Sequence, residues 1–137
     1  MSELIAGMPF AGKLGVEVDS ASPEEVRGGL AYAAELCTAG GVLHGGALMA
    51  LADSLGAICA YLNLPEGATT ATIESKTNFF RPVREGRVEA VTRPLHVGRT
   101  VIVVQTDVRD AAGRHVAQVT QTQAVVGSGH RRDDESS

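Results

Sequence analysis

The feature that most constrains the fold is a long apolar segment in the middle of the chain with the periodicity of a helix. It runs from Gly45 to about Asn63, and Pro65 and Gly67 predict its end. Apolar residues recur there at three- and four-residue steps, namely Leu48, Leu51, Ala52, Leu55, Ile58, Cys59 and Leu62. The opposite face carries small residues, namely Ala50, Ser54, Ala57 and Ala60. We therefore expect this helix to be covered on nearly every side.

The rest of the chain has the pattern of β-strands. Two strand-like segments, 14–20 and 25–35, precede the helix, and a short helix between Ser2 and Phe10 fits the N-terminal sequence. Four segments rich in Val, Thr and Ile follow the helix, at 70–80, 86–97, 100–109 and 115–126. We expect these four to form a meander in an antiparallel sheet wrapped around the helix, which is a two-layer α+β domain. One sheet covers only one side of a helix, so a second subunit is the simplest cover for the other.

Length and composition fit one compact domain. The chain has 137 residues, 44% hydrophobic and 20% charged, and we assign the domain to residues 1–126. The polar and charged tail at 127–137 is predicted to be disordered. A formal charge of -4 argues against nucleic-acid binding. The two cysteines, Cys37 and Cys59, lack metal-ligand spacing and are interpreted as reduced, buried apolar residues.

No targeting or membrane segment is expected from the sequence. The N-terminus has neither the cationic start nor the apolar run of a signal peptide. The apolar stretch 36–65 is interrupted by glycine pairs, His44 and Asp53, so an uninterrupted span of about 18 apolar residues is not expected. These features predict a cytoplasmic protein.

Asp53 is the only formal charge between Glu35 and Glu66. A carboxylate in an apolar helix must have a partner, reach solvent or be neutralised, because burying it alone is costly. In the structural interpretation it is hydrogen-bonded to a neighbouring loop. In the functional interpretation it lines an apolar cleft and acts as a base or nucleophile. The spacing alone favours neither.

The sequence His44-Gly45-Gly46 begins the helix. The first helical N–H groups have no partner within the helix, so they can stabilise an anion or a carbonyl oxygen that gains negative charge. Alone, a glycine pair more often only allows close packing, and His44 is better interpreted as a structural hydrogen-bonding group than as a base. Gly45 and Asp53 are eight residues apart, which is roughly 12 Å along a helix. A reacting carbonyl must lie about 3 Å from both groups, so two subunits would have to supply them.

Basic residues outnumber acidic ones between positions 76 and 99. They are Lys76, Arg81, Arg84, Arg87, Arg93 and Arg99, against only Glu85 and Glu89. Such a cluster suits a phosphate-bearing ligand, although a solvated sheet edge that resists strand pairing is the more common explanation.

Two motifs carry a resemblance to a known family. The run GVLHGGALMALAD at 41–53 and the run NFFRPVREG at 78–86 resemble the hotdog-fold acyl-CoA thioesterases, in particular the phenylacetate-degradation and 4-hydroxybenzoyl-CoA types. The resemblance spans about residues 15–126. It implies the hotdog fold and a homodimer whose two sheets join, usually paired again into a homotetramer. It also implies active sites at the subunit interface, with coenzyme A along the surface.

The resemblance also implies roles for individual residues. Asp53 would be the nucleophile or general base, the Gly45 N–H would polarise the thioester carbonyl, and His44 would order the loop before the helix. Thr72 falls where some relatives hold the attacking water, although strand parity places Thr72 on the face opposite Ile73 and Phe79. The predicted substrate and coenzyme A contacts are Thr38, Gly46, Phe80, Arg81, Pro82, Arg99 and Thr100. Thr38 is a departure, because relatives often carry Asn or Gln there. No metal is expected, and no cofactor beyond the coenzyme A of the substrate.

The leading hypothesis is hydrolysis of an acyl- or aryl-acyl-CoA to the free acid and coenzyme A. A non-catalytic acyl-CoA-binding module of the same fold is the alternative from another class. A hydratase or dehydratase of the same fold would need a catalytic histidine paired with an acid, and the HGG context of His44 argues against it. The sequence leaves open the acyl group, the tetramer arrangement and whether Asp53 attacks directly or activates water.

Overall fold

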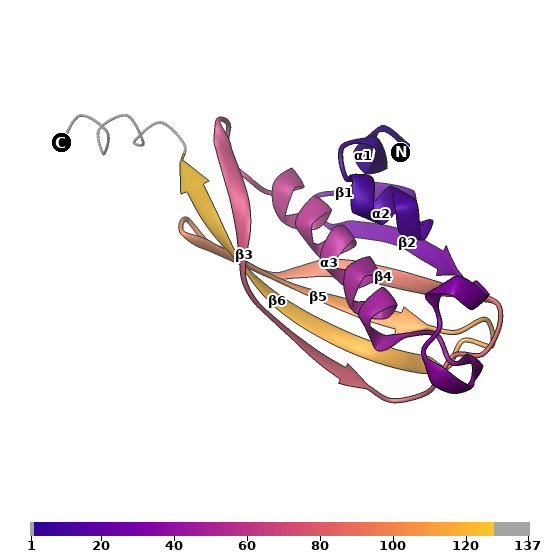
Figure 1. The fold of residues 1–137 in the computed structure, drawn as a ribbon. Helices are drawn as coiled ribbons and strands as arrows, with labels where there is room; N and C mark the ends of the chain where they lie inside the picture. The colour runs from indigo at the N-terminus through magenta and orange to yellow at the C-terminus, as the bar shows by residue number, and fades with distance from the viewer. Residues whose placement is uncertain (1, 128–137) are drawn as a thin grey trace.

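A six-stranded antiparallel sheet curls around one long helix (Figure 1). The structure, a computed structural model, describes residues 2–127. Its helices are α1 (Ser2–Ala6), α2 (Pro9–Leu14) and α3 (Gly45–Leu62), with short 3-10 turns at Ala34–Leu36 and Ala39–Gly41. Its strands are β1 (Glu17–Ser22), β2 (Glu25–Ala31), β3 (Ala68–Phe79), β4 (Arg87–Val97), β5 (Val101–Arg109) and β6 (His115–Gly127). The predicted α+β hotdog architecture is confirmed. Of the predicted disordered tail, only Gly127 is described, as the end of β6, and the remainder lies outside the described residues.

The strand order corrects the predicted meander. The order is β1-β2-β4-β5-β6-β3, so β4, β5 and β6 form a meander but β3 does not precede them in the sheet. Instead β3 pairs with β6 at the far edge, and β4 pairs with β2. The alternation of a strand specifies which side chains face the core but not which strand it pairs with. The consequence for the site is that β3 is an edge strand.

The N-terminal elements also differ from the predicted bounds. Two short helices replace the single helix at 2–10, because Pro9 begins α2 and Gly15 ends it in the left-handed conformation with φ 91°. Leu14 belongs to α2 rather than to the first strand, and the second strand ends at Ala31, before the 3-10 turn. Figure 1 shows α1 and α2 beside β1, at the opposite side of the sheet from β3.

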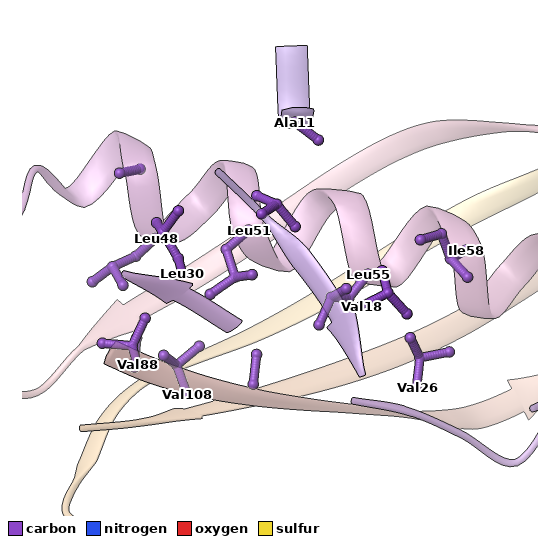
Figure 2. Close-up of a cluster of buried hydrophobic side chains, with 14 of the residues drawn as sticks. Ala11, Val18, Val26, Leu30, Leu48, Leu51, Leu55, Ile58, Val88 and Val108 are labelled. Atoms are coloured by element: carbon purple, nitrogen blue, oxygen red, sulfur yellow. The ribbon is translucent and has the colours of Figure 1, made fainter. Parts of the chain in front are cut away.

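The core lies between α3 and the concave face of the sheet (Figure 2). Leu48, Leu51, Leu55 and Ile58 of α3 meet aliphatic side chains of β1, β2, β4 and β5, and Ala11 of α2 adds to the cluster. Leu51 and Leu55 are fully buried. Cys59 is fully buried as predicted, and desolvation raises the pKa of its thiol to about 11, whereas Cys37 is only half-buried.

By length and composition alone, α3 could cross a membrane, even though its apolar run includes the single charge of Asp53. However, 56% of this helix is buried within the fold. The glycine pair and the single carboxylate do not interrupt it, because both are compatible with helical backbone. Packing against the sheet explains its apolar composition.

Candidate active site

One stripe of α3 is not covered by the residues that the structure describes. Gly46, Met49, Asp53 and Tyr61 are exposed and follow one another at spacings of three, four and eight residues, so they line up along the helix. The expectation of nearly complete cover holds for Ser54 and Ala60, which are buried. Ala50 and Ala57 are only half-buried. We call the four exposed residues the open stripe.

Asp53 lies in the middle of the open stripe. Its Oδ1 accepts a hydrogen bond from Nε2 of Gln121, a β6 residue that is 1% exposed, at 2.5 Å. Its Oδ2 accepts no hydrogen bond from residues 2–127. Asp53 thus has a partner and also reaches solvent, and the partner is a strand residue rather than the neighbouring loop of the structural interpretation.

The start of α3 places three groups in different environments. Nδ1 of His44 accepts a hydrogen bond from the Gly46 N–H at 2.7 Å, so His44 caps the helix. A Cβ at Gly45 would lie 3.0 Å from Cζ of Phe79, so the first glycine permits close packing of that ring. The Gly45 N–H has no acceptor within the described chain. Close packing and a free N–H donor therefore occur together in this turn.

The Gly45 turn borders a surface hollow of about 350 Å³. Of the predicted site residues, five line it, namely Thr38, Gly45, Phe80, Arg81 and Pro82. A second hollow of about 570 Å³ continues from Arg81 and Pro82 toward Arg84 and Arg114. Asp53 lines neither hollow, in agreement with its distance from Gly45 along the helix.

Thr72 lies on a different face from the predicted one. The pairing of β3 with β6 shifts register between Thr72 and Glu74, which is a β-bulge at Ile73. Thr72 is opposite Gln123 and Phe79 is opposite Ala117, and both β6 residues are buried under α3. The bulge reverses the parity, so Thr72 shares the inward face with Phe79. Its Oγ1 accepts a hydrogen bond from Nε2 of Gln123 at 3.0 Å.

Arg99 and Thr100 lie far from the other predicted coenzyme A contacts within one chain. They form the turn before β5, whose first residue Val101 is opposite Ala124 of β6. Phe79 is opposite Ala117, seven residues earlier on β6, which corresponds to roughly 23 Å along the strand. The structure therefore separates these residues from Phe80, Arg81 and Pro82.

The basic cluster divides into two groups. Arg87 forms ion pairs with Glu89, Asp19 and Glu17, and the Glu89 and Asp19 carboxylates raise the pKa of its guanidinium further. Arg93 pairs with Glu25, and Arg84 donates to the Gly40 carbonyl. Lys76, Arg81 and Arg99 form no ion pair with the residues that the structure describes. Carboxylates thus occupy Arg87 and Arg93, whereas the second group and Arg84, which forms no ion pair within residues 2–127 either, can contact an anionic ligand.

Two glutamines near Asp53 were not anticipated as site residues. Gln121 and Gln123 are both 1% exposed and alternate along β6 with the same period as buried Val119. Two amides on the apolar face of a strand were a visible signal in the sequence. The sequence does not indicate their hydrogen-bond partners, because Gln121 and Asp53 are 68 positions apart.

Known proteins resemble this chain in both sequence and structure. The family model described as the thioesterase superfamily matches residues 40–117. The 1,4-dihydroxy-2-naphthoyl-CoA hydrolase of Escherichia coli is 37% identical over 86 residues, which are 63% of each chain. The proofreading thioesterase EntH of Klebsiella pneumoniae is 38% identical over 87 residues, which are 64% of each. The match therefore spans less than two thirds of these relatives. The crystal structure of the thioesterase PA1618 of Pseudomonas aeruginosa superposes with a TM-score of 0.86 at 30% identity, covering 91% of this chain and 92% of that one.

Proposed function

The chain belongs to the thioesterase superfamily, and from this premise we propose that it hydrolyses an acyl- or aryl-acyl-CoA thioester. The products are the free acid and coenzyme A. The observation that supports this most directly is the free Gly45 N–H at the start of α3, beside a hollow lined by Phe80 and Arg81. A relative of similar sequence bears the name of a CoA-thioester hydrolase.

The proposed chemistry uses two groups of α3. The Asp53 carboxylate either attacks the carbonyl carbon or takes a proton from a water that attacks it. The carbonyl oxygen gains negative charge and accepts a hydrogen bond from the Gly45 N–H, which the positive end of the helix dipole reinforces. In the water route the carbon–sulfur bond breaks, the proton that Asp53 took passes to the sulfur, and coenzyme A leaves as the thiol with the free acid. In the direct route coenzyme A leaves as the thiolate and an acyl–Asp53 anhydride remains, which water hydrolyses to the free acid and the Asp53 carboxylate. No step calls on a metal or further cofactor.

The two groups come from different subunits in this proposal. Asp53 and Gly45 of one α3 are roughly 12 Å apart, too far to contact one carbonyl. The open stripe and the edge strand β3 expose apolar side chains that a second copy would cover, among them Met49, Tyr61, Ile73, Phe79 and Phe80. Large exposed apolar surface beside an unpaired strand edge is typical of a subunit interface. We therefore propose a homodimer, and by resemblance a homotetramer and a cytoplasmic location.

Antiparallel pairing of the two β3 edges would also bring the predicted coenzyme A contacts of the two subunits close together. A two-fold axis at this edge sets the Arg99–Thr100 end of one sheet toward the Phe80–Arg81 end of the other. Arg99 and Arg81, which are both unpaired in residues 2–127, could then contact one phosphate-bearing ligand.

Replacement of Asp53 tests the reaction. Asp53→Asn keeps an oxygen acceptor for Gln121 but removes the charge, and we expect kcat to fall at least about a hundredfold. Release of thiol from a panel of acyl-CoA esters is the measurement, with exposed Glu66→Gln as the control that keeps full activity. Near-normal turnover of Asp53→Asn would exclude Asp53 from the reaction. Binding of coenzyme A without thiol release by the unmodified protein would assign a binding module instead.

A further inference from the structure

Two buried glutamines connect Asp53 to the edge strand. Nε2 of Gln121 donates to Oδ1 of Asp53, and Nε2 of Gln123 donates to Oε1 of Gln121 at 3.5 Å. Gln123 also donates to Oγ1 of Thr72 at 3.0 Å and accepts from Oγ1 of Thr70 at 3.1 Å. The described chain thus contains a continuous series of hydrogen bonds from the carboxylate through β6 to β3.

The chemistry of the groups fixes the direction of each hydrogen bond. An ionised carboxylate only accepts, so the amide NH₂ of Gln121 must face Asp53. This turns Oε1 of Gln121 toward the NH₂ of Gln123, whose own oxygen then faces the Thr70 hydroxyl. Gln121 cannot flip without losing a bond at both ends, and a flip of Gln123 would turn its oxygen toward Oε1 of Gln121 and lose that bond. An unsatisfied buried amide costs about 1–3 kcal/mol. The Gln121 donor is therefore held rigidly against one oxygen of Asp53.

The helix is adapted to the same contact. A Cβ at Gly56 would overlap Oε1 of Gln121. Gly56 lies one turn after Asp53 in the middle of α3, where glycine costs about 1 kcal/mol relative to alanine. The absence of a side chain leaves the space through which the Gln121 amide reaches Asp53.

We propose that Gln121 is a positioning residue for Asp53, with Gln123, Thr72 and Gly56 holding Gln121 in place. This inference rests on the proposed role of Asp53. Gln121 binds Oδ1 and so fixes the torsions of the Asp53 side chain, while Oδ2 receives no hydrogen bond within residues 2–127 and is left for the carbonyl carbon or the water. In general, replacing both partners of a buried hydrogen bond by apolar groups of the same shape can be nearly neutral for stability. The buried amides serve the orientation of the carboxylate.

The test replaces the donor while keeping its volume. Gln121→Met has a similar length and no donor, and we expect kcat to fall about ten- to a hundredfold, the cost of a misplaced reacting group. We expect KM to stay within about twofold, since Gln121 does not line the substrate hollow. We expect the thermal midpoint to stay within about 3 °C. Gly56→Ala, which displaces the amide from the other side, should lower kcat in the same way.

A buried polar pair elsewhere on the sheet provides the matched control. Thr92 and Thr106 share a hydrogen bond of 2.6 Å under α3 and contact neither Asp53 nor the glutamines by hydrogen bonds within residues 2–127. Thr106→Val should lower the thermal midpoint and leave kcat unchanged. Combining Gln121→Met with Asp53→Asn should give no further loss beyond Asp53→Asn alone, because Gln121 acts through the carboxylate.

The outcomes separate this inference from the proposed function. Unchanged turnover of Asp53→Asn overturns the role of Asp53 itself. A large loss in Asp53→Asn together with wild-type kcat in both Gln121→Met and Gly56→Ala overturns only the role of Gln121. The role of Gln121 is also overturned if the loss of kcat is accompanied by a proportional fall in the thermal midpoint. It is overturned as well if Gln121→Met lowers kcat by the same factor in the Asp53→Asn background. Either result would indicate a purely structural role for Gln121. Gly56→Ala decides the question if Gln121→Met does not fold.

Discussion

The surface beneath α3 has two halves that differ in chemistry. In the closed half, formed by β1, β2, β4 and β5, the inward side chains include Val26, Leu30, Val88, Ile102 and Val104, all fully buried. In the open half, formed by β3 and residues 121–127 of β6, the inward side chains include Gln121, Gln123, Thr70 and Thr72, and the exposed ring of Phe79 lies at the far end of β3. This difference in chemistry indicates that the two halves have different roles. The closed half stabilises the chain, and the open half carries the groups proposed for chemistry and for contact with a second copy.

Truncations on the two faces of α3 test this division most strongly. Leu55 is fully buried against the closed half, and Leu55→Ala should lower the free energy of unfolding by about 2–5 kcal/mol, because it leaves a cavity. Met49 is 40% exposed on the open stripe, and Met49→Ala should cost less than about 1 kcal/mol at low protein concentration. Urea denaturation followed by circular dichroism measures both. Equal costs in dilute solution would mean that the open stripe is covered within one chain.

A charge on the open edge should weaken subunit association. Ile73 is 60% exposed at the bulge of β3, and Ile73→Lys should raise the dimer dissociation constant at least about tenfold, since lysine on an edge strand opposes pairing. Activity per chain should then fall on dilution and recover at high concentration. Leu95→Lys, at a residue of similar exposure (57%) on β4, is the control. Sedimentation that shows dissociation in the control but not in Ile73→Lys would place the interface on the other side of the sheet.

Local patterns in the sequence predicted the parts of the fold that depend on short-range order. The apolar period and Pro65 predicted α3 with nearly its observed bounds, and the strand segments after it were assigned with errors of one or two residues. The partner of β3 could not be predicted, because alternation does not encode pairing. The bulge at Ile73 could not be predicted either, and it alone reversed the face assigned to Thr72.

The candidate site shows the same limit. The sequence indicated Asp53 and the His44-Gly45-Gly46 turn because a charge in an apolar helix and a glycine pair at its start are visible locally. It did not indicate Gln121, whose meaning depends on a contact between α3 and β6. Likewise, the ion pairs of Arg87 with Glu17 and Asp19 join residues about 70 positions apart, so the basic cluster appeared larger in the sequence than it is in the fold.

Asp110 provides a structural counterpart to Asp53, with a smaller expected effect. It is 8% exposed in the β5–β6 turn and accepts hydrogen bonds from the N–H groups of Arg114 and Ala112 and from Nε of Arg114. The backbone N–H of Arg114 is the largest cause that lowers the pKa of this carboxyl below its usual 3.8. A lowered pKa in the folded state stabilises the fold above the usual value, and the benefit disappears as pH falls through the folded-state pKa.

The corresponding variant separates stability from activity. Asp110→Asn should lower the thermal midpoint at pH 7 by an amount that stays constant to about pH 5 and shrinks below about pH 4. Its kcat should remain that of the unmodified protein, in contrast to Asp53→Asn. A series of thermal melts across this pH range is the measurement. A difference that grows on acidification would contradict the assignment.

The smallest expected effect concerns a single hydroxyl in the open half. Oγ1 of Thr77 is buried and has no hydrogen-bond partner among the described residues, whereas Thr92 in the closed half is paired with Thr106. An unsatisfied buried hydroxyl is costly, so Thr77→Val should raise the free energy of unfolding by up to about 1 kcal/mol, while Thr92→Val should lower it by a similar amount. Urea midpoints at low and high protein concentration compare the two.

If Thr77→Val is destabilising only at high concentration, the hydroxyl finds its partner in the second copy, and the interface reaches inward past the edge of β3. If Thr77→Val is destabilising at every concentration, the Thr77 hydroxyl makes its hydrogen bond within one chain. The contrast between the two halves then does not extend to Thr77.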